Sequence, residues 1–484
     1  MSLSSAISNA LSGLTATTRA TELVSTNISN KSVAGYARRE LETSSRTYAS
    51  GGIRIDGVQR MVNAGLLADN RLAQAASSQS GTVAAFHAAI EGAYGTADDP
   101  GALTSLLTGF NAALTSAAAR PDSDTRLGAV LDAASALTGK IRSVSATITT
   151  ARAEADRTIG RDVDKLNGAL EQVAELNRQI TVLTARGEDA SPLIDTRQAA
   201  IDEIASLVPI QEVARENGRI ALFTKGGATL LDGNAPAKVS FQAANAMSTA
   251  MTVGNGDLSR LSLNGKPLSE AEMGMFAGGT IAANFQIRDD LAPQYQTRID
   301  AFAREVCVRF ADPAVDGTLA AGTAGMFTDA QSASNPAAEP GLANRIAVNA
   351  ALDPAMGGAL WRIREGVNAT DPGSGGDATL IQAMGAALTD TRTPSSAAMS
   401  SSTRSMLQFA ADLTSGAATN RVRADASALQ DQTRADSLNI MLLAQGVDTD
   451  TEMEALLSLE KAYAANAKVF QTVNGMLDEI LRLT

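Results

Sequence analysis

Hydrophobic residues recur at helical spacing at both ends of the chain. In the first thirty residues, apolar or small positions advance by alternating steps of four and three, which is the spacing of a heptad seam between packed helices. The last thirty residues repeat the pattern, with one polar interruption at Asn466. The seam positions are Leu3, Ile7, Ala10, Leu14, Thr17, Thr21, Val24 and Ile28 at one end, and Leu456, Leu459, Tyr463, Asn466, Phe470, Val473, Leu477 and Ile480 at the other.

Both terminal helices need a partner. Isolated helices are marginal in water, and burial of a seam side chain contributes roughly 1.5 to 3 kcal/mol only when another surface covers it. We therefore expect the two ends to pair with each other or with neighbouring molecules. A lone polar residue in such a seam costs stability but can fix register and partner number. Asn466 is therefore either a specificity device or a tolerated polar position.

Helical periodicity is strongest in the middle of the chain from Ser123 to Arg186, where Gly187 offers a stop. If continuous, this helix is a rod of roughly 90 Å. A second helix is predicted to begin at the cap Ser191 and the first-turn Pro192, and to stop before Pro209. Helical character returns over residues 285–310 and 401–445.

The period changes to that of strands between Pro209 and Leu231. Alternating residues are interrupted there by Glu216-Asn217-Gly218 and by Gly226-Gly227, which predicts a β-meander of two or three strands. Residues 235–279 hold further short strand-like pieces. Residues 312–377 are rich in Gly, Ala, Pro and Ser and have poor periodicity, so both segments are interpreted as outer, less regular insertions.

These patterns predict a mainly α protein with a smaller β-containing region. A chain of 484 residues is too long for one ordinary core. We expect three parts: a coiled-coil-like terminal domain in which the N- and C-terminal helices pair, a long-helix rod domain, and an outer β or irregular insertion. The predicted divisions are 1–64 with 441–484 for the terminal helical assembly domain, 65–208 with 280–311 and 378–440 for the helical rod domain, and 209–279 with 312–377 for the outer region.

Composition and charge narrow the range of functions. Hydrophobic residues make up 44% of the chain but aromatic residues only 4%, which favours close helix packing over aromatic-lined pockets. The formal net charge of −12 would repel nucleic-acid backbones and anionic membrane surfaces, so neither is an expected partner. No apolar stretch reaches the roughly 18 residues of a membrane span. The single cysteine, Cys307, cannot form an internal disulfide and is predicted to be a buried apolar residue.

Candidate catalytic and metal-binding motifs are weak. The single histidine, His87, lies in an ordinary helical stretch, which leaves little scope for Ser-His or Cys-His chemistry. The segment GVDTDTEMEALL resembles a calcium loop, but Met453 replaces the required glycine and Leu459 replaces the bidentate glutamate. Capping of the last helix by Asp448 or Thr449 explains it better. We predict no catalytic, cofactor-binding or metal site, and a protein that is not an enzyme.

The two ends resemble a known family. A turn with Asn27, Ile28, Asn30, Gly35, Tyr36 and Arg38 or Arg39 follows the first helix, and it is similar to the N-terminal signature of the axial proteins of the bacterial flagellum. The C-terminal stretch is similar to the closing helix of the same family. Its matching positions are Gly446, Val447, Asp450, Glu452, Tyr463, Asn466, Ala467, Val469, Thr472 and Leu477.

Three pieces in the middle resemble the hook-associated protein 1 family within that group. They are LIDTRQAAIDEIASLVPI with Asp195 and Arg197, GGTIAANFQIRDD with Gly278, Gly279, Arg288 and Asp289, and GLANRIAVNAAL after MFTD. Gln198 stands where the family commonly has Asp. The resemblance implies export as a largely unfolded chain through the flagellar type III apparatus, and assembly outside the cell as a structural adaptor between hook and filament.

The resemblance also implies partners and site residues. The partners would be further copies of the chain in a ring or tube, the hook protein, a second hook-filament junction protein, and an export chaperone while the chain is unfolded. The expected polymer interface comprises the large seam residues with Asn466: Leu3, Ile7, Leu14, Val24, Ile28, Leu456, Leu459, Tyr463, Asn466, Phe470, Val473, Leu477 and Ile480. In the family-signature turn, Gly35 would take backbone angles closed to other residues, Asn27 and Asn30 would cap backbone groups, Tyr36 would anchor the exit against the neighbouring layer, and Arg38 completes the set.

Two other functions remain open from the sequence. The chain could be another flagellar axial protein, of the hook or the distal rod, since those proteins share both terminal signatures. A more remote alternative is a cell-wall hydrolase that uses paired Asp or Glu residues and is associated with flagellar assembly.

Overall fold

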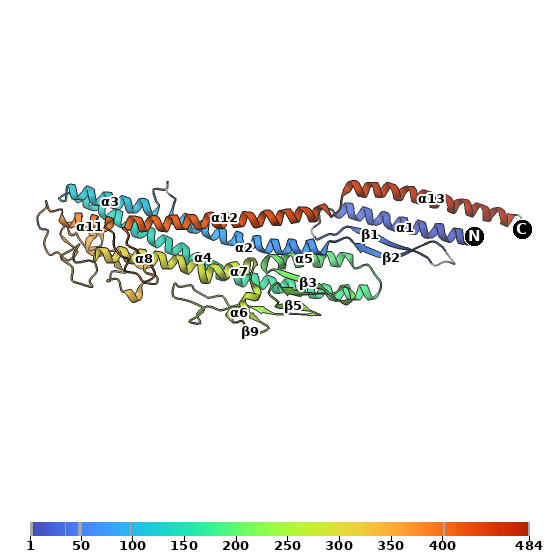
Figure 1. Cartoon of the computed structure of the whole chain (residues 1–484), viewed down its shortest axis with the longest axis horizontal. Coiled ribbons are helices and arrows are strands. Elements are labelled where there is room, and N and C mark those ends of the chain that lie inside the picture. Colours follow the sequence, from blue (N-terminus) through green and yellow to red (C-terminus); the bar gives the residue numbers. More distant parts are fainter. Residues whose placement is uncertain (1–2, 34, 47–50, 97, 400–401, 483–484) are drawn as a thin grey trace.

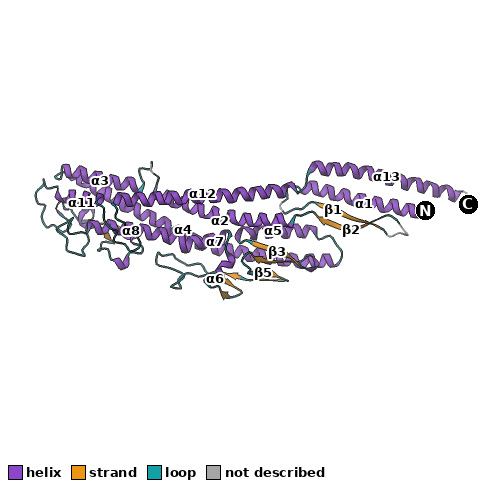
Figure 2. Ribbon diagram, in the orientation of Figure 1, coloured by secondary structure: helices purple, strands orange, loops and turns teal. Residues whose placement is uncertain are grey.

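The molecule is elongated, and most of its helices run along its long axis (Figures 1 and 2). The computed structural model describes residues 3–33, 35–46, 51–96, 98–399 and 402–482. The first described helix, α1 (Leu3–Asn30), and the last, α13 (Thr449–Arg482), form one end of the molecule. The remaining helices form a thicker rod from which these two project.

The two terminal helices pack against each other in antiparallel orientation. Gly13 of α1 faces Asn466 of α13, and Asn27 is hydrogen-bonded to Glu452. Fourteen residues forward along α1 therefore correspond to fourteen residues back along α13, so one register holds over about four turns. The expected pairing of the ends is present, and its coiled-coil character stays a prediction.

One long helix forms the backbone of the rod. Helix α4 (Asp124–Ala185) has 62 residues and is about 90 Å long, which confirms the helix predicted over Ser123–Arg186. Gly187 adopts a φ of 72°, and the N–H groups of Gly187 and Glu188 donate to the carbonyls of Thr184 and Leu183. This left-handed residue ends the helix.

Other helices pack along α4 and along each other. Helices α2 (Ala64–Tyr94) and α12 (Met406–Ala444) lie side by side, and α3 (Leu103–Ala119), α5 (Ser191–Leu207), α7 (Gly279–Gln286) and α8 (Ala292–Phe310) contact α4. A π-helical turn, Ile287–Leu291, joins α7 to α8. Pro192 lies in the first turn of α5 as predicted, but Ser191 is already helical and donates its N–H to Asp189. The shorter helices are α6 (Glu270–Met273), α9 (Leu342–Arg345), α10 (Arg362–Glu365) and α11 (Thr379–Thr389).

The strands of the described residues form four small antiparallel sheets. Strands β3 (Ile210–Ala214), β4 (Ile220–Thr224), β5 (Thr229–Asp232) and β6 (Ala235–Pro236) pair in that order, so the meander predicted from residue 209 onward is present. Strands β7 (Val239–Ser240), β8 (Ser262–Leu263) and β9 (Lys266–Pro267) form a second sheet, and β10 (Phe327–Asp329) pairs with β11 (Ile346–Val348). A hairpin of β1 (Arg39–Ser45) and β2 (Ile53–Arg60), which sequence patterns did not indicate, lies against α1.

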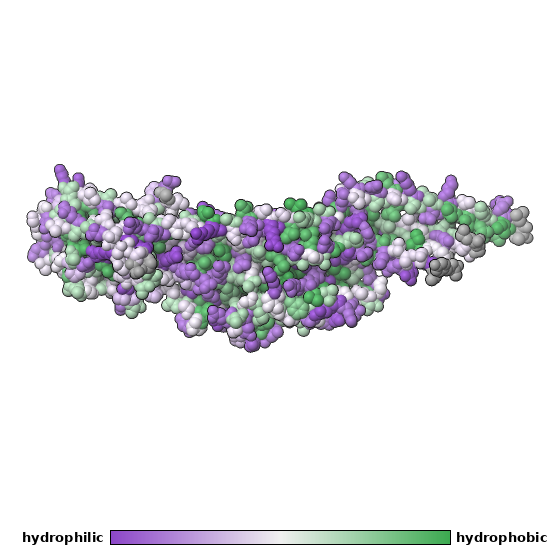
Figure 3. Space-filling model, in the orientation of Figure 1, coloured by the Kyte–Doolittle hydropathy of each residue, from purple (hydrophilic) through white to green (hydrophobic). Residues whose placement is uncertain are grey.

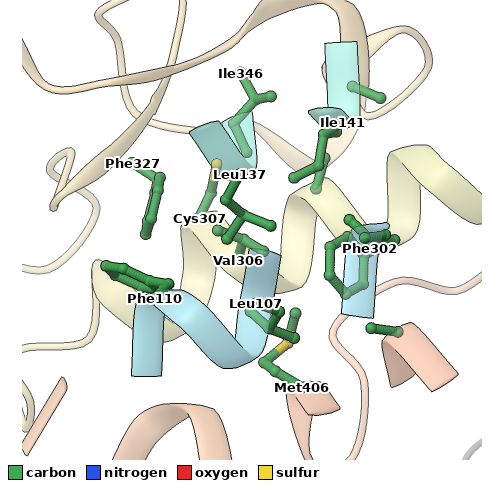
Figure 4. Close-up of a cluster of buried hydrophobic side chains, with 14 of the residues drawn as sticks. Leu107, Phe110, Leu137, Ile141, Phe302, Val306, Cys307, Phe327, Ile346 and Met406 are labelled. Atoms are coloured by element: carbon green, nitrogen blue, oxygen red, sulfur yellow. The ribbon is translucent and has the colours of Figure 1, made fainter. Parts of the chain in front are cut away.

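Two large hydrophobic clusters stabilise the rod. The first joins α3, the first half of α4, α8 and the start of α12 (Figure 4), and it includes Phe327 and Ile346 from residues 312–377. The second lies along the other half of α4 and includes residues of α5 and of β3 to β5. Residues 209–279 and 312–377 thus pack into different clusters, although the sequence grouped them in one outer region. The division into domains stays a prediction.

Cys307 is buried in the first cluster, 1% exposed, and burial raises the pKa of its thiol to about 12. It is a packed apolar residue, as predicted. His87 is also buried, and its Nδ1 lies 3.0 Å from the hydroxyl of Tyr295. Because Asn420 donates to the same hydroxyl, that hydroxyl is free to donate to His87. Burial lowers the pKa of His87, while the Asp425 carboxylate opposes the shift.

We predict that His87 makes the fold sensitive to acid. A basic group whose pKa is lower in the folded than in the unfolded state makes its full contribution to stability at pH values above its unfolded pKa, which is about 6.5 for histidine. It loses that contribution as the pH falls below this value. The free energy of unfolding should therefore decrease between pH 7 and 5, with a slope of at most about 1.4 kcal/mol per pH unit from this group. In His87→Gln, which retains a hydrogen-bond acceptor, this part of the slope should disappear. Chemical denaturation at several pH values measures it, and parallel curves for the two proteins would contradict the prediction.

Candidate assembly interface: the terminal pair and the polar network at its base

The interior of the terminal pair, defined as α1 with α13, is built from small residues on the α1 side. Ala10, Gly13, Ala16 and Thr17 are buried there. A Cβ atom on Gly13 would lie 2.8 to 2.9 Å from the side-chain amide atoms of Asn466, closer than van der Waals contact allows. Asn466 thus occupies the space that Gly13 leaves free. This fit favours the register role of Asn466 over a merely tolerated polar position.

The apolar seam is only partly covered within one chain. Val24 and Val473 are buried, whereas Tyr463 and Ile480 are 50% and 46% exposed. The other residues of the expected polymer interface have intermediate exposure: Leu3, Ile7, Leu14, Ile28, Leu456, Leu459, Asn466, Phe470 and Leu477. The pairing of α1 with α13 therefore leaves part of the seam open to a further partner. The assignment of these residues to a polymer interface stays a prediction.

Exposed hydrophobic side chains are concentrated near the two ends of the chain. Of the 21 large hydrophobic residues that are exposed in the described part of the chain, 18 lie within residues 11–62 and 422–481. On the face drawn in Figure 3, hydrophobic residues are visible along the edge formed by α12 and on the terminal pair. Apolar surface gathered in this way marks interaction sites rather than ordinary surface variation.

A buried polar network joins the terminal pair to the rod. We call it the neck network; it consists of Asn27, Tyr36, Arg38, Arg39, Arg60, Asp195 and Glu452. At its centre, the Asn27 Oδ1 accepts from the Arg39 N–H at 3.0 Å and from the Tyr36 hydroxyl at 2.7 Å. The Asn27 Nδ2 donates to the Arg39 carbonyl and to Glu452 Oε2. One amide therefore ties α1 to the start of β1 and to the first turn of α13.

Glu452 connects the neck network to α13. Its side chain is 1% exposed, and its Oε1 accepts from Arg38 Nε at 2.6 Å. Arg38 also pairs with Glu40 at 2.5 Å. Burial alone would lower the pKa of Arg38, but its hydrogen bond to Glu452 and the attraction of both carboxylates outweigh burial and raise it. The guanidinium therefore stays charged and holds α13 against the hairpin.

Asp195 of α5 connects the hairpin to the rod. Its Oδ2 accepts from Arg39 Nη2 at 2.5 Å, and its Oδ1 accepts from Arg60 Nε and Nη2 at 2.9 and 2.6 Å. Two arginines from paired ends of β1 and β2 thus share one carboxylate. Gly35 approaches the same turn of α5 with a φ of 78°, where a Cβ would lie 2.8 Å from the Asp195 carbonyl oxygen. This position requires glycine.

Tyr36 lies inside the network rather than on an outer surface. The Arg39 guanidinium carbon lies 4.9 Å from the centre of its ring, a cation–π distance. Burial is the largest cause of the raised pKa of Tyr36; Asp195 and Glu452 add to it and Arg39 opposes it. The hydroxyl therefore stays protonated and donates to Asn27. Contact of Tyr36 with a neighbouring layer stays a prediction.

Four of the five signature residues come together in the structure: Asn27, Gly35, Tyr36 and Arg38. Asn30 does not join them, because its Nδ2 donates to the Thr26 carbonyl within α1. Asn27 caps the start of β1 rather than the helix. Sequence reasoning missed that Arg39, Arg60, Asp195 and Glu452 meet, although Asp195 and Glu452 each belonged to a family-like stretch. For Asp195 and Glu452, which lie on helices, an acidic residue beside apolar ones was the available signal.

Gln198, the residue that departs from the family pattern, has a polar role of its own. Its Oε1 accepts from Arg71 Nη2 at 2.5 Å, and its Nε2 donates to Glu212 at 3.2 Å. Arg71 also pairs with Asp202 and Glu212. This second network joins α2 to α5 and β3 next to the neck network.

The candidate calcium loop acts as a helix cap. Asp448 accepts from the Asp450 N–H and the Thr451 hydroxyl, and these bonds lower the pKa of Asp448. Within the described residues, no group of three or more His, Cys, Asp or Glu side chains could hold a metal ion. None of the described helices combines the length and apolar character needed to cross a membrane.

We predict that Gly13 and Asn466 are energetically coupled. Gly13→Ala adds helix propensity of about 1 kcal/mol but forces the new methyl group into Asn466. In an Asn466→Ala background the methyl group has room, so the same substitution should be more favourable there by roughly 0.5 to 3 kcal/mol. Denaturation of the four proteins of this double-mutant cycle, followed by circular dichroism, measures the coupling. Additive effects would show that Asn466 is not seated on Gly13.

We predict that Glu452→Gln weakens the neck network. The substitution keeps the shape of the side chain but removes the negative charge that Arg38 contacts, at a cost of roughly 1.5 to 3 kcal/mol. Amide hydrogen exchange should become faster in β1 and in the first turn of α13. Glu454→Gln is the matched control, since Glu454 is exposed two residues further along the same helix. Equal exchange in both variants would mean that Glu452 does not hold the two elements together.

Comparisons with known proteins assign this architecture to a family. Residues 88–327 match the flagellar hook-associated protein FlgK helical domain, and residues 441–483 match the C-terminal region of flagellar basal body rod FlgEFG proteins. The first match covers most of the rod, and the second covers α13 with the end of α12.

Individual relatives agree with these matches. Flagellar hook-associated protein 1 of Salmonella typhimurium is 28% identical over 260 residues, which covers 52% of this chain and 47% of the relative. Flagellar hook-associated protein 1 of Escherichia coli K12 is 26% identical over 285 residues, covering 56% of this chain and 51% of the relative. The matches thus span about half the length of these curated relatives.

A solved structure is also similar, at a level that carries no argument by itself. The flagellar hook junction protein FlgK from Burkholderia pseudomallei is 16% identical with a TM-score of 0.43, over 54% of this chain and 46% of that one. The helical-domain match, the C-terminal match and the two relatives instead decide the assignment: the chain belongs to the flagellar hook-associated protein 1 family.

Proposed function

We propose that the chain is a structural adaptor that joins the flagellar hook to the filament and assembles through its terminal helices after export. The observation that supports this most directly is the concentration of exposed hydrophobic residues near the two ends of the chain. A surface of this kind is unfavourable in an isolated molecule and is stabilised once neighbours cover it. Head-to-tail contacts between identical copies generate rings or helical tubes.

The terminal pair is suited to such contacts on physical grounds. Its α1 side presents small residues to α13, so the two helices approach closely, while larger apolar side chains of α13 remain uncovered at the flanks. Val469 and Met476, which are 48% and 53% exposed, are examples. Copies that meet along these flanks would offset the entropy lost when long helices become ordered.

The neck network gives the assembly its geometry. Asp195 belongs to the rod, Glu452 belongs to the terminal pair, and arginines of the hairpin bind both. Because these charges are buried or half-buried and paired in defined directions, the terminal pair has a fixed orientation relative to the rod. Identical orientation in every copy is a requirement for a regular ring or tube.

The proposed partners follow from the names of the relatives. Those relatives are flagellar hook-associated proteins. We infer that this chain contacts further copies of itself, the hook protein on one side and a second junction protein on the other, with an export chaperone while unfolded. The role we infer is structural and not catalytic, and the site of action is the flagellum outside the cell.

Another axial protein, of the hook or distal rod, is the second candidate. The match of residues 441–483 to basal body rod proteins favours it at the C-terminal end. A hook protein is expected to be mainly β between its ends, whereas the elements between residues 65 and 440 of this chain are mainly helical. The helical-domain match to residues 88–327 supports the junction function over this alternative. No observation favours a cell-wall hydrolase.

We predict that removal of residues 450–484 abolishes assembly but leaves the rod folded. The deletion takes away α13 and with it Glu452 and the partner of α1, whereas both large clusters of the rod remain. Electron microscopy of isolated hooks incubated with gold-tagged protein measures assembly. The full chain should label the distal hook end, and the truncated chain should not.

Circular dichroism and thermal unfolding of the truncated chain provide the control for folding. Normal labelling of hook ends by the truncated chain would refute assembly through the terminal helices. Absence of labelling by a folded full-length chain would instead favour the rod or hook alternative.

A further inference from the structure

The second half of α12 carries an apolar stripe that nothing covers in the described chain. Val422, Leu429, Ile440 and Leu443 are 57%, 69%, 65% and 68% exposed. Their spacings of seven, eleven and three residues place all four on one side of a helix with about 3.6 residues per turn. Ala435, which is buried, lies on the side of α12 that packs against α2. We call these four residues the α12 stripe.

Basic residues lie along one edge of the α12 stripe, and acidic residues lie among its apolar side chains. Arg423 and Arg434 are eleven residues apart, about three turns, and therefore lie along one flank. Asp425 and Asp436 have the same spacing, and they lie on the same side of α12 as the stripe itself, in the direction of Leu443. Asp425 pairs with Arg421, and Asp436 accepts from Gln432 at 2.9 Å. The structure gives neither Arg423 nor Arg434 an acidic partner within the described residues, so the basic flank remains available.

The α12 stripe continues towards the terminal pair. At its end, a groove of about 640 Å³ lies between the last turns of α12 and the base of the hairpin. Leu443 lines it on one side, and Val33, Met61 and Val62, which are 54%, 40% and 41% exposed, line it on the other. Beyond the groove, exposed apolar residues of α13 begin at Met453 and Leu457. The apolar surface is therefore continuous across the neck.

We propose that a second copy of this chain docks on the α12 stripe, so that the assembly surface extends past the terminal pair onto the rod. The inference rests on the proposed function and names a further surface for it. Continuity with the terminal pair is one argument. Charge is the other: each copy has a formal net charge of −12, so two copies repel on average, and an apolar stripe beside two unpaired arginines is where the acidic surface of another copy is attracted.

The first experiment is site-specific photocrosslinking in the full chain assembled on isolated hooks. A benzoylphenylalanine replaces Leu429 in the α12 stripe, Val469 on α13, or Met356, which is 64% exposed elsewhere on the rod. We expect adducts between copies of the chain from positions 429 and 469 and none from 356. Mass spectrometry of the adducts identifies the residue of the second copy that is contacted.

The outcomes separate this inference from the proposed function. An adduct between copies from position 469 but not from 429 overturns the docking of a second copy on α12 and leaves assembly through the terminal helices standing. An adduct from position 429 to the hook protein alone also overturns it. No adduct from either position on a chain that folds normally overturns the proposed function as well.

Charge substitutions supply a second measurement. Leu429→Glu and Ile440→Glu place a carboxylate in the α12 stripe and should lower the assembled fraction at a fixed protein concentration by about tenfold or more. Met356→Glu is the matched control, because it makes the same change at an exposed apolar residue outside the stripe. Circular dichroism should be unchanged in all three proteins, since each side chain is exposed. Equal assembly of the three variants would contradict the proposal.

Discussion

The neck network is the constraint on which the arrangement of the molecule depends. The terminal pair contacts the rod over a limited region, so its orientation is set by a few buried polar groups rather than by a broad apolar interface. Asn27 joins α1 to β1 and α13, Glu452 joins α13 to Arg38, and Asp195 joins the hairpin to α5 through Arg39 and Arg60. Buried ion pairs are weak sources of stability, but loss of one partner is costly because the other charge stays buried. Such a network therefore specifies one geometry more than it adds to the free energy of folding.

Apolar surface is distributed unevenly between the two parts of the molecule. In the rod, α4 presents one face along its whole length to two clusters in which many side chains are completely buried. In the terminal pair, seven described residues of α1, most of them small, and two of α13 are buried. The rod therefore has the core of an independently stable domain, whereas the core of the terminal pair is incomplete within one chain. The same imbalance underlies both the proposed function and the proposed role of α12.

Exposed apolar residues cost solubility, and the charge of the chain counteracts this. A net charge of −12 keeps separate molecules apart on average. Contacts between copies must then be local, where apolar area is sufficient and charges are complementary. The open flanks of the terminal pair offer apolar area, and the α12 stripe offers apolar area beside Arg423 and Arg434. Small, buried α1 residues such as Gly13 add register, because Asn466 fits opposite a residue that lacks a Cβ.

The sequence by itself determined the local elements whose physics is periodic. The heptad steps at both ends, the long α4 with its stop at Gly187, and the meander after Pro209 follow from side-chain spacing and turn residues, which act over a few positions. It also determined that Cys307 is apolar in role and that the last helix is capped at Asp448 or Thr449, between which the structure selects Asp448. Tertiary structure alone decided which distant groups meet. Asp195 and Glu452 lie more than 250 residues apart in sequence, and no periodicity links either of them to Arg38, Arg39 or Arg60.

Residues 312–377 lack periodicity yet pack into the core of the rod. Burial of Phe327 and Ile346 depends on α4 and α8 and not on their neighbours in the sequence. Tertiary structure also decided that the α12 stripe is exposed. The spacing of Val422, Leu429, Ile440 and Leu443 suits a buried helix face as well as an exposed one. The stripe is uncovered because α2 packs on the opposite side of α12.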